Sequence, residues 1–367
     1  MSKPVALDLE QGHTLLLKGP AWIRAKGGDA QCLGARIQSD DWTMIEGSRQ
    51  EPIYAADDTL LEIRRGAGSS LSVVGESTVP VAWKEAAQVL QRQRGVCVII
   101  GEVDSGKSSL CTFLANKCLE DTGKVGVVDA DVGQADIGPP TTISSSVVQA
   151  PIIGLHKVAA EISFFIGDTS PSFVPDKVVA LATRLKRRMT RSADTVLVNT
   201  DGWLTEFNAL RHKQLLLEEI QPDLVIRLSR SDEVIDPLLD RVKFASLKLP
   251  TSPFARIRSK EERKKAREAG YRRFLQGSQK LGISQETRVR LFDQLQQTVF
   301  PEDRRLRGLV AGLLNQNEEL LSIGRISQVG NGRVIVETKT IEKPTILEIG
   351  NIALSSRYDE VGYGTLH

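Results

Sequence analysis

The stretch that most constrains the fold is VCVIIGEVDSGKSSL, residues 96–110. Its first five residues are apolar, a run typical of a parallel strand that is covered on both faces. Directly after this run, Gly101, Gly106, Lys107 and Ser108 match every fixed position of the template G-x-x-x-x-G-K-[ST]. Such a loop joins a buried strand to the N-terminus of a helix. The sequence therefore predicts an α/β domain that binds the phosphates of a nucleotide.

The same strand–helix pattern repeats along the centre of the chain. Apolar runs at 124–133, 195–203 and 223–230 have the length of buried strands, and residues 108–120 and 210–221 have helical spacing. Alternation of this kind predicts a P-loop NTPase fold of class α/β, with a doubly wound, mostly parallel sheet.

Short, turn-punctuated strand patterns flank this region on both sides. We expect a small N-terminal β-sandwich domain and a small C-terminal β-rich domain, the latter with an Asn331–Gly332 hairpin turn. Within the C-terminal domain, residues 284–297 have a composition that predicts a helix. The expected boundaries are 1–85 for the N-terminal β domain, 86–283 for the P-loop domain and 284–367 for the C-terminal domain.

Composition excludes several classes of protein. Hydrophobic residues make up 41% of the chain, but no apolar run approaches the roughly 20 residues that span a bilayer. The first residues lack the apolar core of a signal peptide, so we expect a cytoplasmic protein without a membrane partner. The four cysteines form no Cys-x-x-Cys pair and are interpreted as buried, reduced thiols. The four histidines show no metal-ligand spacing, which argues against a zinc site.

Positive charge is concentrated although the net charge is only +2. Residues 256–273 hold nine basic and three acidic side chains, and residues 184–191 hold five basic side chains and no acidic one. Such stretches suit binding to phosphates at particular places. Each could equally be a solvated helix face, and charge alone does not decide between the two.

The P-loop motif assigns chemistry to its residues. Backbone N–H groups of the curled loop and the positive N-terminus of the helix would bind phosphate oxygens. Lys107 would reach the β- and γ-phosphates of ATP, and Ser108 would ligate Mg²⁺. The predicted nucleotide-binding residues are Gly101, Asp104, Ser105, Gly106, Lys107, Ser108 and Ser109.

Two carboxylates lie at the carboxyl end of the next predicted strand, where ligands of open α/β sheets gather. Asp129 and Asp131 are two residues apart and so share one face of a strand. One could hold the hydration shell of Mg²⁺ while the other accepts the proton of an attacking hydroxyl. Alternatively, one of them caps the loop by bonding its own backbone.

Two further features indicate what receives the phosphate. No guanine-reading Asn-Lys-x-Asp motif follows a later strand; instead, 199–203 reads NTDGW, and Trp203 could stack on a base or belong to the core. Arg263 and Arg267 share one face of a predicted helix, with Arg258 about one turn earlier. Arginines that close over a triphosphate neutralise charge on the transferred group.

Together these motifs resemble the polynucleotide 5′-hydroxyl kinase family, which includes the RNA kinase of the pre-mRNA cleavage machinery and its ribosomal-RNA-processing relatives. GEVDSGKSS is similar to the family's phosphate loop, and DVGQ at 131–134 is similar to its Walker-B-like segment. GDTSP at 167–171 resembles the clasp that holds the acceptor end, and NTDGW resembles the segment with the stacking tryptophan. The arginine spacing within 256–275 resembles the family's lid.

The resemblance implies roles for individual residues. Asp131 would be the general base and, with Asp129 and Ser108, part of the metal site. Lys107 and the lid residues Arg258, Arg263 and Arg267 would stabilise the transferred phosphoryl group. The substrate-binding residues would be Gln134, Thr169, Ser170 and Trp203.

The sequence is thus interpreted as a compact, prokaryotic, ATP- and Mg²⁺-dependent kinase of RNA or DNA 5′-hydroxyl ends, with RNA-processing proteins as possible partners. Two other interpretations stay open. An ATP-loaded scaffold subunit with little kinase activity would carry the same P-loop. A small-molecule kinase would too, but it would leave the basic stretches without a role.

Overall fold

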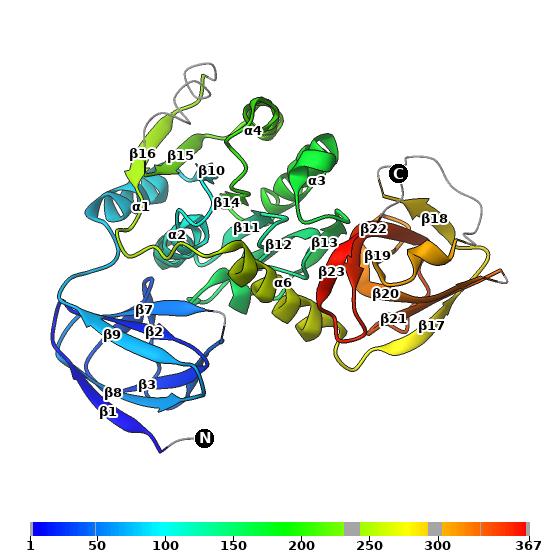
Figure 1. The fold of residues 1–367 in the computed structure, drawn as a ribbon. Coiled ribbons are helices and arrows are strands. Elements are labelled where there is room, and N and C mark those ends of the chain that lie inside the picture. Colours follow the sequence, from blue (N-terminus) through cyan, green and yellow to red (C-terminus); the bar gives the residue numbers. More distant parts are fainter. Residues whose placement is uncertain (1–2, 48, 231–242, 293–302, 331, 365–367) are drawn as a thin grey trace.

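The computed structural model describes residues 3–47, 49–230, 243–292, 303–330 and 332–364. The chain forms three units in sequence order: an N-terminal pair of β-sheets, a central sheet flanked by helices, and a C-terminal β-sheet (Figure 1).

The N-terminal domain is a sandwich of two antiparallel sheets, as expected. Its strands alternate between buried and partly exposed positions because one face of each sheet covers the shared core. In spatial order, one sheet contains β1 (Val5–Leu9), β8 (Thr59–Arg65), β3 (Ala21–Gly27) and β6 (Thr43–Ile45), and the other contains β5 (Ala35–Arg36), β4 (Ala30–Cys32), β7 (Gln50–Ala55), β2 (Thr14–Lys18) and β9 (Ser70–Val74).

The central domain is built on a seven-stranded, mostly parallel sheet. Four of its neighbouring pairs are parallel, and antiparallel pairing is confined to the edge formed by its last two strands. In spatial order the strands are β16 (Ser246–Pro250), β15 (Leu224–Ser229), β10 (Gly95–Gly101), β14 (Thr195–Thr200), β11 (Val125–Ala130), β12 (Thr142–Val148) and β13 (Ile162–Phe165).

Helices cover both faces of this sheet, which explains why its inner strands are apolar at consecutive positions. On β10, Cys97 and Ile99 face the core shared with α1 (Val81–Gln93) and α2 (Lys107–Thr122). The alternate residues Val96 and Val98 face the second core, under α3 (Pro175–Met189) and α4 (Phe207–Ile220). The connecting segments include the 3-10 turns η1 (Leu155–Lys157) and η2 (Pro171–Phe173).

Helix α6 (Lys260–Leu275) follows β16 and lies between the central domain and the C-terminal sheet (Figure 1). Ser259 begins this helix with a capping box: its hydroxyl accepts from the Glu262 N–H at 3.1 Å, and the Glu262 carboxylate accepts from the Ser259 N–H at 2.9 Å. The start of the helix within the predicted lid is therefore determined by neighbouring residues.

The C-terminal sheet begins with β17, which pairs with β21, so the strand at 279–283 lies in the same sheet as the strands that follow it. In spatial order the sheet contains β17 (Gln279–Ile283), β21 (Arg333–Thr338), β20 (Leu320–Gly330), β19 (Leu309–Leu314), β22 (Ile346–Leu354) and β18 (Arg288–Leu291), with β23 (Glu360–Tyr363) paired to β22 and η3 (Arg304–Leu306) before β19.

The helix predicted over 284–297 is wrong for its described part, because residues 288–291 form β18, parallel to β22. Val289 and Leu291 alternate with arginines, and this two-residue period suits an edge strand. Residues 293–297 lie outside the described part of the chain. So does Asn331 of the predicted turn, although β20 and β21 pair as antiparallel strands on either side of it.

The predicted fold class is confirmed by these three units. All four cysteines are buried and unpaired, as expected. Among the helices of the described residues, none has the combined length and apolarity needed to cross a membrane.

Candidate active site

The P-loop leaves β10 at Gly101 and enters α2 at Lys107. Gly106 has a φ of +94°, in the left-handed region that favours glycine. No side chain caps the N-terminus of α2. The first N–H groups of the helix are therefore available to phosphate oxygens, together with the positive end of the helix dipole.

Lys107 is buried beneath this loop, with 5% of its surface exposed. Its Nζ donates to the Glu102 carbonyl at 2.7 Å, so the amine folds back onto the loop. Burial lowers the pKa of Lys107, while the charges of Asp131 and Asp201 oppose that effect. A bound phosphate would stabilise the charged form of this buried lysine, which burial alone disfavours.

The two carboxylates after β11 have different surroundings. Asp129 is buried; its Oδ2 accepts from the Asp136 and Ile137 N–H groups at 2.7 and 2.9 Å, and its Oδ1 accepts from Asn199 Nδ2 at 3.0 Å. Burial raises the pKa of Asp129, and the charge of Asp136 adds to this. Asp129 thus holds the turn that follows β11.

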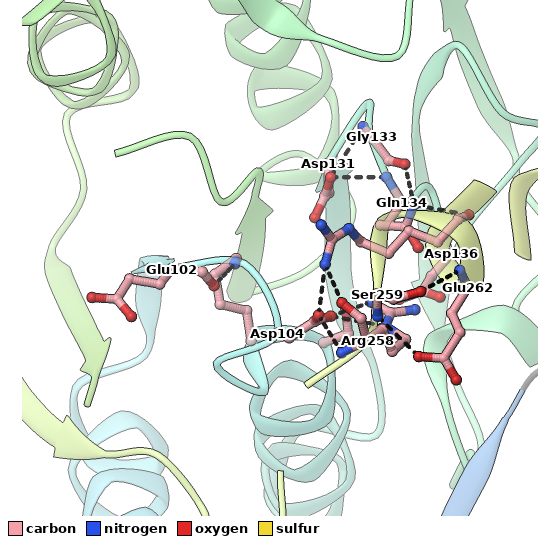
Figure 2. Close-up of polar contacts among 12 residues, drawn as sticks. Glu102, Asp104, Asp131, Gly133, Gln134, Asp136, Arg258, Ser259 and Glu262 are labelled. Carbon is pink, nitrogen blue, oxygen red and sulfur yellow. Dashed lines mark hydrogen bonds and ion pairs between the residues drawn. The ribbon is translucent and has the colours of Figure 1, made fainter. Parts of the chain in front are cut away.

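Asp131 is half-buried at the same end of the sheet. Its Oδ1 accepts from the Gly133 and Gln134 N–H groups at 3.1 and 3.0 Å (Figure 2). Within the described residues, no hydrogen bond is made by its Oδ2. Burial raises the pKa of Asp131 to about 6, against the opposing charge of Lys107. A carboxylate with one anchored and one free oxygen, and a pKa near neutrality, can act as a general base.

Asp136 was missed by the sequence interpretation. It is buried, and it forms an ion pair with Arg49 of the N-terminal domain. Burial works against its charge, but Arg49, His156 and a hydrogen bond from Ser108 lower its pKa. Asp136 therefore connects the N-terminal domain to the P-loop serine. The signal that could have found it is its place five residues after Asp131, in the same polar turn.

Asp104 of the P-loop binds two of the three predicted lid arginines (Figure 2). Its carboxylate accepts from Arg258 Nε at 2.8 Å and the Arg258 N–H at 2.9 Å, and from Arg263 Nη1 at 3.1 Å. Only 2% of the Asp104 side chain is exposed. Burial works against its charge, but the contacts with Arg258 and Arg263 lower the pKa of Asp104, so it is charged at neutral pH.

The third lid arginine has a different partner. Arg267 Nε and Nη2 donate to the two carboxylate oxygens of Glu360 at 2.6 and 2.7 Å. Glu360 belongs to β23 of the C-terminal sheet. Gln134 reaches the lid from the other side, with its Nε2 3.5 Å from the Arg263 carbonyl. All three arginines thus lie at the phosphate loop or beside it, each with an acidic partner.

The predicted clasp lies against the turn that carries Asp131. The carbonyl of Thr169 lies next to Gly133. The N–H of Ser170 donates to buried Asp168 at 2.8 Å, and the Ser170 hydroxyl lies 2.7 Å from that of Ser172. Thr169 and Ser170 are half-buried, so their side chains are accessible beside the candidate base.

Trp203 lies at the end of β14, half-buried, with its ring 5.8 Å from that of His212. The backbone N–H of Trp203 donates to the Asp201 carboxylate at 2.9 Å, and Asp201 forms an ion pair with Lys213 at 2.5 Å. Asp201 and Lys213 are both buried, a pair that the sequence interpretation missed. A buried ion pair therefore holds the backbone of Trp203 in place through Asp201.

The basic run at 184–191 lies elsewhere. Met189, within the run, packs against Gly126 near the start of β11, whereas Asp131 follows the end of that strand. Arg184 stacks on Phe164 and donates to the Asn317 carbonyl at 2.9 Å. The run therefore lies at the end of the sheet where the parallel strands begin, whereas the P-loop lies at the end where they finish. The contacts described for it are typical of the end of a surface helix.

A cavity of about 450 Å³ joins the P-loop, the N-terminal domain and the lid. Its walls include Lys107, Ser108 and Asp131 on one side, and Glu51 and Arg273 on others. The volume and the mixture of backbone N–H groups and cationic side chains suit a nucleoside triphosphate.

The residues also fit Mg²⁺, which is held in kinases by one or two carboxylates together with phosphate oxygens and water. Ser108 lies within hydrogen-bonding reach of Asp136, and the buried Asn199 Oδ1 beside it has no hydrogen-bond partner in the described residues. Within those residues, no three acidic or histidine side chains converge as a closed metal site.

Glu51 gives a prediction for stability. Burial in the cavity wall raises its pKa to about 7, from an ordinary value of 4.5. A raised pKa means that stability present below about pH 4.5 is lost as pH rises through 7. Glu51→Gln should therefore raise the Tm of the ligand-free protein at pH 8, by the equivalent of up to about 3 kcal/mol, and leave it unchanged at pH 4. Exposed Glu76→Gln is the control; an equal gain at both pH values would contradict the burial argument.

Fold and site together define a P-loop protein with a buried lysine, a candidate catalytic carboxylate and an arginine-bearing helix beside the loop. Residues 101–277 match the model of the family described as mRNA cleavage and polyadenylation factor CLP1 P-loop. This part of the chain is similar to that family, and the resemblance found in the sequence is confirmed.

Several curated relatives carry kinase names. The polyribonucleotide 5′-hydroxyl-kinase of Pyrococcus furiosus is 32% identical over 192 residues, which is 52% of this chain and 54% of that protein. A CLP1 homologue of Brugia malayi is 27% identical over 279 residues, or 72% of this chain and 63% of that protein. The match to the Pyrococcus kinase therefore spans about half the length of that relative.

Solved structures share the whole fold. The structure of a wild-type Clp1p–Pcf11p complex superposes with a TM-score of 0.75 over 96% of this chain and 98% of the solved chain, at 12% sequence identity. At that identity the likeness supports the three-unit architecture alone.

Proposed function

We propose that this protein is a polynucleotide 5′-hydroxyl kinase that transfers the γ-phosphate of ATP to the 5′-hydroxyl end of RNA or DNA. The observation that carries the proposal is the convergence of Lys107, Asp131 and the lid arginines at one end of the central sheet. Names of the relatives point to the same reaction.

The donor side of the reaction uses the P-loop. Backbone N–H groups of residues 104–109 and the α2 N-terminus would bind the phosphates, and Lys107 would exchange the Glu102 carbonyl for phosphate oxygens. Ser108, with Asp129 and Asp131, would hold Mg²⁺, which neutralises charge on the phosphates. Arg258 and Arg263 already lie at the loop through Asp104.

The acceptor side would use groups at the same end of the central sheet, beyond the phosphate loop. Asp131 Oδ2 would accept the proton of the 5′-hydroxyl, while Gln134 supports the turn that orients it. Thr169 and Ser170 would contact the terminal nucleotide, and Trp203 would stack on its base, a contact worth about 1–3 kcal/mol. Because phosphoryl transfer needs mainly positioning and charge stabilisation, these groups suffice in kind.

The Asp104 contacts yield a prediction for ATP binding. Asp104→Asn removes a negative charge beside the phosphates, so we expect ATP to bind about tenfold more tightly, or about 1.4 kcal/mol. Asparagine is the suitable replacement because residue 104 has a φ of +59°, which asparagine tolerates.

Isothermal titration with ATP, or with a non-hydrolysable analogue, measures this change. Asp194→Asn is the control, since it removes the same charge from an exposed pair with Arg94. Weaker or unchanged ATP binding in the Asp104 variant would refute the idea that Asp104 competes with phosphate for the lid arginines.

Two alternatives are separated by one assay. γ-Labelled ATP is incubated with matched single- and double-stranded RNA and DNA oligonucleotides that carry 5′-hydroxyl ends. The proposal expects label in at least one nucleic acid and a steep fall of its binding with salt. A scaffold subunit would bind ATP and label none of them, and a small-molecule kinase would label a nucleoside but no oligonucleotide.

A cytoplasmic location is part of the proposal, supported by four unpaired, buried cysteines that suit a reducing compartment. Protein partners from RNA processing are proposed by analogy with the solved Clp1p–Pcf11p complex, which pairs that relative with a second protein.

A further inference from the structure

The C-terminal sheet contacts two parts of the candidate site at once. Its strand β22 lies against the clasp, and its strand β23 lies against the lid helix α6 (Figure 1). Neither contact follows from the motifs in the sequence, since each joins residues that are at least 90 positions apart.

Asn351 of β22 holds the clasp through two hydrogen bonds. Its N–H donates to the Gly167 carbonyl at 2.7 Å, and its Nδ2 donates to Asp168 Oδ2 at 3.0 Å. The other oxygen of Asp168 accepts from the Ser170 N–H, so the amide of Asn351 and the clasp backbone share one buried carboxylate.

A close backbone approach and an ion pair reinforce this contact. A Cβ on Gly350 would lie 2.6 Å from the Gly167 carbonyl, so only glycine fits there. Lys177 of α3, just after the clasp, pairs with Glu348 of β22 and donates to the Ile166 carbonyl at 3.3 Å.

The second contact joins β23 of this sheet to the lid helix α6. The Glu360 carboxylate accepts two parallel hydrogen bonds from Arg267, and the Glu360 backbone N–H donates to the Glu268 carboxylate at 3.1 Å. Arg272, one turn further along α6, pairs with Asp359. A bidentate pair of this kind fixes the plane of the guanidinium as well as its position.

From these contacts we infer that the C-terminal sheet is a positioning element for the reaction: Asn351 sets the acceptor clasp and Glu360 orients Arg267, so that one rigid sheet places acceptor and lid relative to each other. Asn351 and Glu360 act through other residues and touch no substrate themselves. The inference rests on the proposed function for its kinetic consequences, but not for its structural ones.

The kinetic test separates the two residues. Asn351→Ala should raise the KM for a 5′-hydroxyl oligonucleotide about tenfold and leave ATP affinity unchanged. Glu360→Gln should lower kcat about tenfold with little effect on that KM. The controls are Asn315→Ala and Glu337→Gln, which remove an amide and a charge from the same sheet away from the site.

Hydrogen–deuterium exchange provides a readout that does not depend on activity. Asn351→Ala should speed exchange in residues 167–172, and Glu360→Gln should speed it in residues 263–272, each without the other. If Asn351→Ala fails to fold, Lys177→Met removes the second tether of the clasp and should give the same local result.

The outcomes are distinguishable from failure of the proposed function. A wild-type protein that labels no oligonucleotide would refute the kinase proposal, and the exchange experiment would still test the tethers. Unchanged exchange in both segments, or kinetic effects equal to those of the two controls, would overturn the inference.

Discussion

Lys107→Ala is expected to lower phosphoryl transfer about 10³-fold, equivalent to about 4 kcal/mol of transition-state stabilisation. The reason is geometric. The amine of Lys107 is buried at the base of the loop and donates to the Glu102 carbonyl at 2.7 Å, and phosphate oxygens would take the place of that carbonyl as its acceptor. No other described lysine enters the cavity wall at this point. Quench-flow or steady-state measurement of label transfer reports the loss.

Folding should survive this change, because burial already disfavours the charge of Lys107. Lys107→Met serves as a second variant that keeps the apolar stem. Lys117→Ala, on the partly exposed side of the same helix, is the matched control and should retain transfer. Transfer within tenfold of wild type in both Lys107 variants would contradict the assigned role.

The second large effect is expected at Asp131. Asp131→Asn should reduce kcat/KM about 10²- to 10⁴-fold, the usual contribution of a general base. Asparagine keeps the oxygen that accepts from the Gly133 and Gln134 N–H groups, so the turn is expected to persist. ATP binding, measured separately, should remain within a fewfold of wild type.

The pH profile gives an independent test of the same residue. Burial raises the pKa of Asp131 to about 6, and the base must be ionised to accept a proton. The kcat/KM of the wild type should therefore rise about tenfold per pH unit below 6 and level off above it. The residual activity of Asp131→Asn should lack this limb. A limb that persists unchanged in the variant would assign the titration to another group.

Local signals account for what could be predicted from the sequence. The run from Val96 to Ser108 combines a buried strand, a glycine loop and a helix start within thirteen residues, and the structure places β10 and α2 there. The sandwich strands were predictable because their burial alternates along the sequence.

Long-range contacts account for what was missed. The partnership of Asp104 with Arg258 spans 154 positions and that of Asp168 with Asn351 spans 183, so no spacing rule reveals them. The helix predicted at 284–297 was wrong over β18 because its polar composition outweighed a two-residue alternation that only pairing with β22 makes decisive.

The most direct measurement of the central claim locates the transferred phosphate. The protein is incubated with γ-labelled ATP and a 5′-hydroxyl oligoribonucleotide, with the same oligonucleotide bearing a 5′-phosphate as control, and the products are digested to mononucleotides. The account predicts label only on the 5′-phosphate of the first nucleotide of the hydroxyl substrate. Label found only in ATP or in free inorganic phosphate would contradict it.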